Sequence, residues 1–181
     1  MTISIRPADP TDAAALARAL LGNRDHIQPF EPRRPETYYT AEEQAARLSA
    51  PDSRSWALVD REETGTEEAG GERIVGLATL SGIALGPFRS AHLGYWVDAR
   101  YTGRGLATRL VGHVCRAARE ELGLHRVEAG TVLHNTASQR VLAKSGFERI
   151  GTAPRYLHID GAWRDHHLFQ RILHDEDPPI G

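Results

Sequence analysis

The chain has few of the residues that mark several common protein classes. Its 181 residues include a single cysteine, Cys115, which excludes a disulfide within the chain. No stretch approaches the roughly 20 consecutive apolar residues that cross a bilayer, and Met1 to Pro7 lack the basic and apolar start of a secretory signal. We therefore expect a cytoplasmic protein with no membrane partner, in which Cys115 is packed in the interior rather than acting as a nucleophile.

The chain also lacks a large excess of either positive or negative charge. The formal net charge is −2, from 24 acidic and 22 basic residues, which argues against a general nucleic-acid-binding protein. Lys144 is the single lysine, so cationic contacts would come from arginine, whose planar guanidinium suits phosphates and carboxylates. His166, His167 and the other histidines show no metal-ligand spacing. We expect no direct nucleic-acid partner and no metal.

The length, with 40% hydrophobic and 25% charged residues, is typical of one globular domain. We assign residues 1–174 to that domain and residues 175–181 to a short C-terminal tail. The hydrophobic pattern predicts the order strand, two helices, three strands, helix, strand, helix, two strands. This order indicates an α+β class, with a mixed sheet flanked by helices and a parallel strand pair where a helix crosses over.

The expected strands cover residues 3–5, 55–59, 74–80, 92–97, 126–132, 147–157 and 163–173, and the expected helices cover 13–21, 41–48, 105–122 and 136–144. Thr11 and Asp12 are positioned to cap the first helix, and Thr40 with Glu43 forms a capping box for the second. The acidic segment 61–72 has no large apolar residue near its middle, which predicts a mobile hairpin loop.

The segment from Leu93 to Phe147 carries the most functional information. An apolar strand pattern over 93–97 is followed by a turn with glycines at 103 and 105, and then by the longest amphipathic helix. The first N–H groups of a helix have no backbone partner, and glycine lets a phosphate approach them closely. This order predicts a cradle for a diphosphate group.

Three pieces of this segment resemble the GNAT superfamily of acetyltransferases, and in particular the ribosomal-protein N-terminal acetyltransferases of the Rim type. They are Leu93 to Val97 leading into Gly103-x-Gly105-x-Ala107, then Asn135-x-Ala137-Ser138, and then Lys144-x-Gly146-Phe147. The resemblance covers nearly the whole chain. It implies a GNAT-like mixed, mostly antiparallel sheet of six to seven strands, with a splayed parallel central pair, flanked by about four helices.

The resemblance implies that acetyl-coenzyme A is the co-substrate. Its diphosphate would lie on the helix start, its pantetheine arm would pair with the exposed backbone of 95–97, and Asn135 would hold the arm from the other side. Thr102 replaces the glutamine or arginine common in the family, so Arg100 or Arg104 would supply a side-chain donor. The expected cofactor-binding residues are Tyr95, Trp96, Val97, Arg100, Thr102, Gly103, Arg104, Gly105, Leu106, Ala107, Thr108, Asn135 and Ser138.

Direct acetyl transfer needs a neutral amine, donors for the developing oxyanion and a proton for the departing thiolate. Ser138 matches a serine that protonates the thiol in Rim-type relatives, and Tyr156 is a second acid candidate. Glu128, a carboxylate within an apolar strand, is the candidate base. Each has a structural alternative: a helix-opening hydroxyl for Ser138, an aromatic wall for Tyr156 and a salt bridge for Glu128.

The acceptor is expected to be a protein N-terminal α-amine, because its pKa of about 8 leaves a sizeable neutral fraction near neutral pH. A ribosomal protein N-terminus is the specific partner that the resemblance implies. Two alternatives remain open: a small-molecule amine, such as a polyamine, an aminoglycoside or an amino acid analogue, and a non-catalytic acyl-coenzyme A binding module. Residues 29–32, Tyr38, Tyr39 and Trp163 are further candidates for the acceptor walls. The resemblance also allows a homodimer, for which no sequence feature argues.

Overall fold

The computed structural model describes residues 2–61 and 72–177. Its strands are β1 Thr2–Pro7, β2 Arg54–Arg61, β3 Glu72–Ala84, β4 Ser90–Val97, β5 Arg126–Val132, β6 Glu148–Ile159 and β7 Ala162–Ile172. Its helices are α1 Ala13–Gly22, α2 Arg24–Ile27, α3 Ala41–Leu48, α4 Leu106–Glu120 and α5 Thr136–Lys144. The 3-10 turns are η1 Pro10–Asp12, η2 Gln28–Phe30, η3 Glu36–Tyr39 and η4 Ala99–Tyr101.

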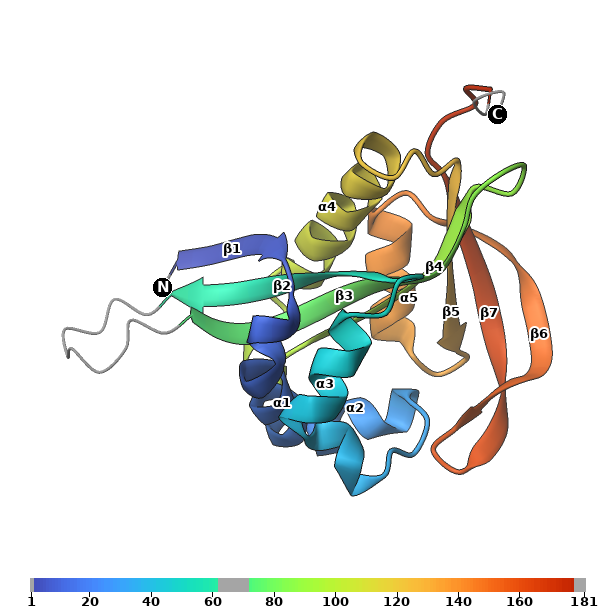
Figure 1. The fold of residues 1–181 in the computed structure, drawn as a ribbon. Helices are drawn as coiled ribbons and strands as arrows, with labels where there is room; N and C mark the ends of the chain where they lie inside the picture. The colour runs from blue at the N-terminus through green and yellow to red at the C-terminus, as the bar shows by residue number, and fades with distance from the viewer. Residues whose placement is uncertain (1, 62–71, 178–181) are drawn as a thin grey trace.

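The strands form one seven-stranded sheet in the order β1-β2-β3-β4-β5-β7-β6, with helices on both faces (Figure 1). Every neighbouring pair is antiparallel except β4 and β5, which are parallel. The predicted α+β class, with a mixed and mostly antiparallel sheet and a parallel central pair, is confirmed. The loop predicted over 61–72 and the end of the tail fall on residues 62–71 and 178–181, outside the described residues.

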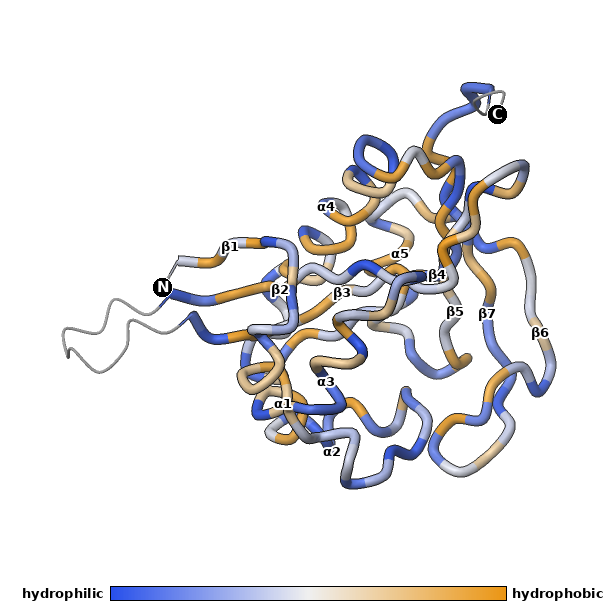
Figure 2. Tube along the Cα trace, in the orientation of Figure 1, coloured by the Kyte–Doolittle hydropathy of each residue, from blue (hydrophilic) through white to orange (hydrophobic). Residues whose placement is uncertain are grey.

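Each face of the sheet carries its own hydrophobic core. Side chains of a strand alternate between the two faces, so Trp56 and Leu58 of β2 join the cluster that contains Leu110 of α4. Ala57 and Val59 point the other way and join the cluster that contains Leu16 of α1. Figure 2 shows hydrophobic segments along the central strands and hydrophilic outer turns.

Cys115 of α4 belongs to the larger core and is 1% exposed. Burial raises the pKa of its thiol, so the side chain stays protonated and apolar at neutral pH. The expectation of a packed cysteine is confirmed.

Asp12 is the N-cap residue of α1, as expected, but its side chain makes no capping bond to that helix. It completes a capping box at η1: Asp9 Oδ1 accepts from the Thr11 N–H at 2.8 Å, and the Asp12 carboxylate accepts from the Asp9 N–H at 3.1 Å. The same carboxylate accepts from Arg6 of β1 at 2.7 and 2.8 Å, and this guanidinium lowers the Asp12 pKa. A charged partner from the preceding strand therefore takes the side chain that local sequence assigned to the helix end.

The second expected cap is present in part, because the Thr40 hydroxyl accepts from the Glu43 N–H at 3.3 Å. The Glu43 side chain pairs with Arg47 at 2.9 Å, one helical turn onward, instead of reaching back to complete the box.

Sequence analysis missed α2 and the 3-10 turns, because single turns are too short to show a helical period. The helix α1 ends at Gly22, and Pro29 lies in the first turn of η2, where a backbone N–H would have no helical partner. This irregular segment reaches the β6–β7 turn: the Asp160 N–H donates to the Glu31 carbonyl at 3.0 Å. The contact places the segment beside the end of the sheet where the candidate site lies.

We expect Leu110→Ala to lower the free energy of unfolding by about 2–5 kcal/mol, because Leu110 is fully buried between α4 and the sheet. Leu21→Ala in α1 is the matched control, since Leu21 is 53% exposed, and it should cost less than about 1 kcal/mol. Urea unfolding followed by circular dichroism measures both values. Equal midpoints for the two variants would contradict this assignment of the core.

Candidate active site

The candidate site is the gap between β4 and β5. The two strands pair at three register positions, and this pairing ends at His92 and Glu128. Beyond these residues, Leu93–Val97 stay paired with β3 and Ala129–Val132 stay paired with β7. The parallel pair is therefore splayed, as expected, and the backbone groups that face the gap have no partner strand.

A cleft of about 1220 Å³ follows this gap. Its walls come from the parted ends of β4 and β5, the start of α4, the helix α5 and the β6–β7 hairpin. The candidate catalytic residues Ser138, Glu128 and Tyr156 all line it. So do the cofactor candidates other than Arg100 and Arg104, so residues far apart in the sequence meet in one cavity.

The glycine turn forms the floor at one end of the cleft. Gly103 and Gly105 adopt left-handed conformations with φ of 74° and 72°, which L side chains rarely adopt. A Cβ at either position would meet no atom within 4 Å, so both glycines face open space. Gly105 is the N-cap of α4 and has no side chain to cap the first helical N–H groups. The cradle can therefore accept an anionic group from the cleft.

Arg100 is engaged by a neighbouring carboxylate, and its contact with the cofactor stays a prediction. Its Nε and Nη2 donate to both oxygens of the buried Asp98 carboxylate, at 3.0 and 2.6 Å. Asp98 also accepts from Asn23 Nδ2 at 3.1 Å, and Asn23 Oδ1 accepts from the Ala99 N–H at 2.9 Å. Arg100 thus fixes the loop before the cradle to the end of α1. Arg104 lies over the Tyr101 ring, 5.2 Å from its centroid.

Ser138 and Tyr95 form a pair across the gap. The Tyr95 hydroxyl lies 2.7 Å from Ser138 Oγ and 3.2 Å from the Ser138 carbonyl oxygen. Burial raises the pKa of Tyr95 to about 12, so its hydroxyl remains a proton donor at physiological pH. Asn135 holds the start of α5, because its Oδ1 accepts from the Ser138 N–H at 3.0 Å. Sequence analysis assigned Tyr95 to the site through its backbone and missed its hydroxyl.

Glu128 lies where the two strands separate, and it is ion-paired. Its Oε1 is 3.1 Å from Arg126 Nη2, and its Oε2 is 3.8 Å from His92 Nε2. The salt bridge considered as the alternative for this residue is therefore present. Tyr156, 40% exposed, packs its ring against His166 at 5.6 Å between centroids.

His166 is a buried cleft residue that the sequence considered only for metal binding. It is 3% exposed, and its Nδ1 is 2.9 Å from the Arg164 carbonyl oxygen. A carbonyl can only accept, so Nδ1 donates in this contact and Nε2 is the ring nitrogen left for another partner. The sequence shows only that a histidine occupies an inward position of a strand. That position alone does not tell whether the side chain faces a cleft or the hydrophobic core.

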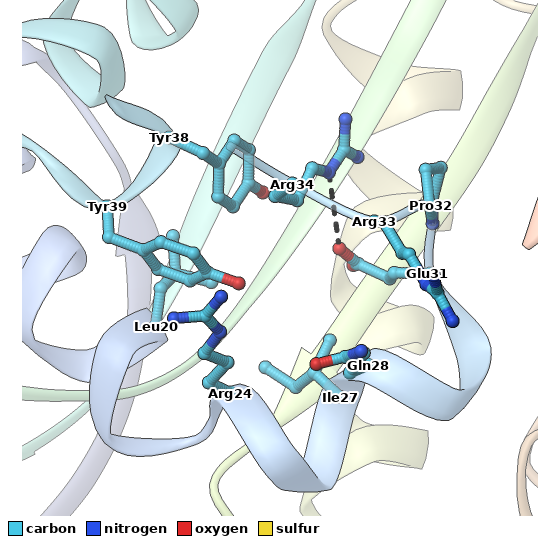
Figure 3. Close-up of a pocket in the computed structure, with 10 residues that line it drawn as sticks. All are labelled: Leu20, Arg24, Ile27, Gln28, Glu31, Pro32, Arg33, Arg34, Tyr38 and Tyr39. Atoms are coloured by element: carbon cyan, nitrogen blue, oxygen red, sulfur yellow. Dashed lines mark ion pairs between the residues drawn. The ribbon is translucent and has the colours of Figure 1, made fainter. Parts of the chain in front are cut away.

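The residues expected to form the acceptor walls lie in three different places in the structure. Phe30, Glu31 and Pro32 line the cleft beside Tyr156, and Phe30 packs against His134 at 5.7 Å between ring centroids. Tyr38 and Tyr39 line a smaller adjoining cavity, shown in Figure 3. Trp163 is 63% exposed and lies outside the set of residues that line either cavity.

Two features are absent from the described residues. No helix in residues 2–61 and 72–177 has the length and apolar character needed to cross a membrane. Within the same ranges, no group of three or more histidine, cysteine or acidic residues is arranged to hold a metal ion.

Comparison with known proteins identifies one family. A profile described as "Acetyltransferase (GNAT) domain" matches residues 2–148. The chain is 35% identical to the probable N-acetyltransferase YjcK of Bacillus subtilis over 97% of this chain and 96% of the relative. It is 32% identical to the [ribosomal protein uS5]-alanine N-acetyltransferase of Escherichia coli, over 96% of this chain and 89% of the relative.

Comparison with solved structures leads to the same family. The ribosomal-protein-S5-alanine acetyltransferase of Vibrio fischeri superposes with a TM-score of 0.88 at 31% identity, over 98% of this chain and 97% of the other. Mycobacterium smegmatis RimJ in complex with CoA-disulfide gives a TM-score of 0.76 at 31% identity, over 94% of this chain and 81% of the other.

We expect Gly105→Glu to abolish coenzyme A binding, because the new carboxylate would occupy the cradle and repel a diphosphate. Gly86→Glu is the matched control: Gly86 has φ of 71° and an equally open Cβ position, but it lies in the β3–β4 turn outside the cleft. Both variants carry the same backbone strain of roughly 1–3 kcal/mol. Titration calorimetry measures affinity and thermal melting measures folding. Retained affinity in a folded Gly105→Glu protein would rule out the cradle.

Proposed function

The chain belongs to the GNAT acetyltransferase family, and on that premise we propose that it acetylates the N-terminal α-amine of a protein, with a ribosomal protein as substrate. It is an N-acetyltransferase. The observation that carries the proposal is the cleft between β4 and β5, whose lining extends from the anion cradle to Phe30, Glu31 and Tyr156. The similarity to S5-alanine acetyltransferases supports the choice of acceptor.

Acetyl-coenzyme A is the co-substrate in this proposal, and it would supply the acetyl group as a thioester. The N–H groups at the start of α4 would hold its diphosphate, since Gly103 and Gly105 leave that space open. The unpaired edges of β4 and β5 would hydrogen-bond the amides of its arm in the manner of an added strand. RimJ was solved with bound CoA-disulfide, which supports this use of the cleft.

Ser138 is proposed to protonate the departing sulfur. The Tyr95 hydroxyl, 2.7 Å away, would donate to Ser138 Oγ and so leave the serine proton directed to the sulfur. The amine nitrogen bonds to the acetyl carbon as the carbon–sulfur bond breaks, and it releases one proton as the thiol gains one. An α-amine with a pKa of about 8 needs no strong base, which is consistent with a Glu128 engaged by Arg126. Glu128 as a weaker base and Tyr156 as a second acid stay predictions.

The charges near the acceptor end argue against a polyamine substrate. Glu31 and Glu128 are the acidic residues that line the cleft, and each has an arginine partner. Arg34 lines the same end. A polycation would need an excess of carboxylates to replace its hydration, and the cleft does not offer one.

The proposed acceptor is tested with three substrates under saturating acetyl-coenzyme A: a peptide with a free N-terminal alanine, the same peptide blocked at the N-terminus and carrying an internal lysine, and spermidine. We expect the free peptide to gain one acetyl group by mass spectrometry. The other two should show kcat/KM values at least about tenfold lower, because an amine of pKa near 10.4 has a roughly hundredfold smaller neutral fraction. Faster turnover of spermidine would overturn the proposal.

We expect Ser138→Ala to lower kcat by about 10–100-fold while the affinity for coenzyme A changes little, since a general acid acts only on the leaving group. Tyr95→Phe should give a smaller loss, because the serine proton remains. Thr136→Ala, an exposed hydroxyl in the same helix turn, is the control and should leave kcat unchanged. A Ser138→Ala enzyme with the original kcat would assign the acid to another group.

A further inference from the structure

A second cavity opens off the acceptor end of the cleft. It holds about 150 Å³ and is built from α1, α2 and the irregular segment up to η3 (Figure 3). Ile27, Glu31, Pro32 and Arg34 line both this cavity and the main cleft. The two spaces therefore adjoin along these four residues, and the smaller one has the volume of a benzene-sized group or a short side chain.

Three arginines and one glutamate supply the formal charges that line this side cavity. Arg24 is 2.8 Å from Glu36, and Arg33 is 3.4 Å from Asp160, so each has an acidic partner outside the cavity lining. Arg34 differs. Its nearest carboxylate oxygen, on Glu31, is 3.8 Å from its Nε, which is beyond hydrogen-bond length.

The Nε–H of Arg34 is buried and has no hydrogen-bond acceptor among the described residues. The guanidinium is nevertheless held in place, 4.6 Å above the centre of the Tyr38 ring. Figure 3 shows the two groups together, with Glu31 across the cavity from the ring. A buried donor without an acceptor is costly, so this site is arranged for a group that arrives with one.

Glu31 is the one acidic residue among the residues that line this cavity, against three arginines. Burial raises the pKa of its carboxyl, and the nearby Arg34 and Arg47 offset this only in part. Burial also raises the pKa of Tyr38, whose hydroxyl therefore stays protonated at neutral pH. The balance of fixed groups is cationic, and a planar carboxylate matches a guanidinium edge best.

We propose that this side cavity binds an acidic side chain of the acceptor, close to the amine that is acetylated, through Arg34. The proposal rests on the proposed function and narrows it to protein N-termini that carry aspartate or glutamate within their first few residues. It follows from the residues that the two cavities share, the Arg34 Nε–H that has no hydrogen-bond acceptor among the described residues, and the excess of arginine over glutamate in the lining.

The test compares peptides that begin with alanine and carry one aspartate at position two, three or four with peptides that carry asparagine at the same place. We expect the wild-type enzyme to prefer aspartate at one position by about tenfold in kcat/KM, mainly through KM. Arg34→Met should reduce this preference to less than about twofold, through a higher KM for the aspartate peptides. Arg18→Met removes the same charge from an exposed site on α1 and should keep the preference.

If Arg34→Met melts well below the wild type, Arg34→Lys replaces it; that variant keeps the charge but loses the planar donors, and it should retain part of the preference. Equal rates for aspartate and asparagine at every position overturn the inference and leave N-terminal acetylation intact. A preference that survives in both Arg34 variants also overturns it. Failure to acetylate any peptide removes the proposed function and the inference together. Inhibition by free acetate without an aspartate preference assigns the cavity to a free anion.

Discussion

The structure depends on a parallel pairing that stops early. β4 and β5 are joined at three register positions, and each strand is held on its outer side by an antiparallel partner, β3 or β7. Neither strand can swing back to close the gap without breaking one of those pairings. Two rows of backbone groups therefore face each other across a cleft in the middle of the sheet. Unpaired strand edges are a liability in most proteins, and here they provide the hydrogen-bonding capacity of the site.

Side chains, not backbone ladders, join the two sides of the gap. Tyr95 of β4 reaches Ser138 of α5, and Asp98 at the end of β4 ties α1 and Arg100 to the loop before the cradle. These links keep the glycine turn aligned with the strand that precedes it. They also explain why Arg100 is not among the residues that line the cleft: a buried Asp98 carboxylate needs a cation more than an exposed cradle does.

Sequence analysis worked where one local rule decided the outcome. The helix predicted over 136–144 has those bounds in the structure, and so does the strand predicted over 126–132, because the local hydrophobic pattern decides both. It failed where a side chain had two partners to choose from. Asp12 faced both a helix end and Arg6, and the ion pair with Arg6 of the preceding strand takes its carboxylate. The Arg34 cavity was not predictable at all, because residues 24–39 lack a period and take their shape from contacts with distant segments.

The contrast between regular elements and irregular turns explains how one scaffold can serve different acceptors. The cradle and the parted strands belong to regular elements packed into the larger core, so a change there costs folding energy. The acceptor end belongs to short turns held mainly by polar contacts, such as the Glu31 carbonyl with the Asp160 N–H and Arg33 with the Asp160 carboxylate. Substitutions in this segment alter charge and shape at the acceptor end without reaching the cradle. Acceptor choice can therefore change while the cofactor half stays constant, and the arginines of residues 24–34 are where this chain differs from a cleft suited to polycations.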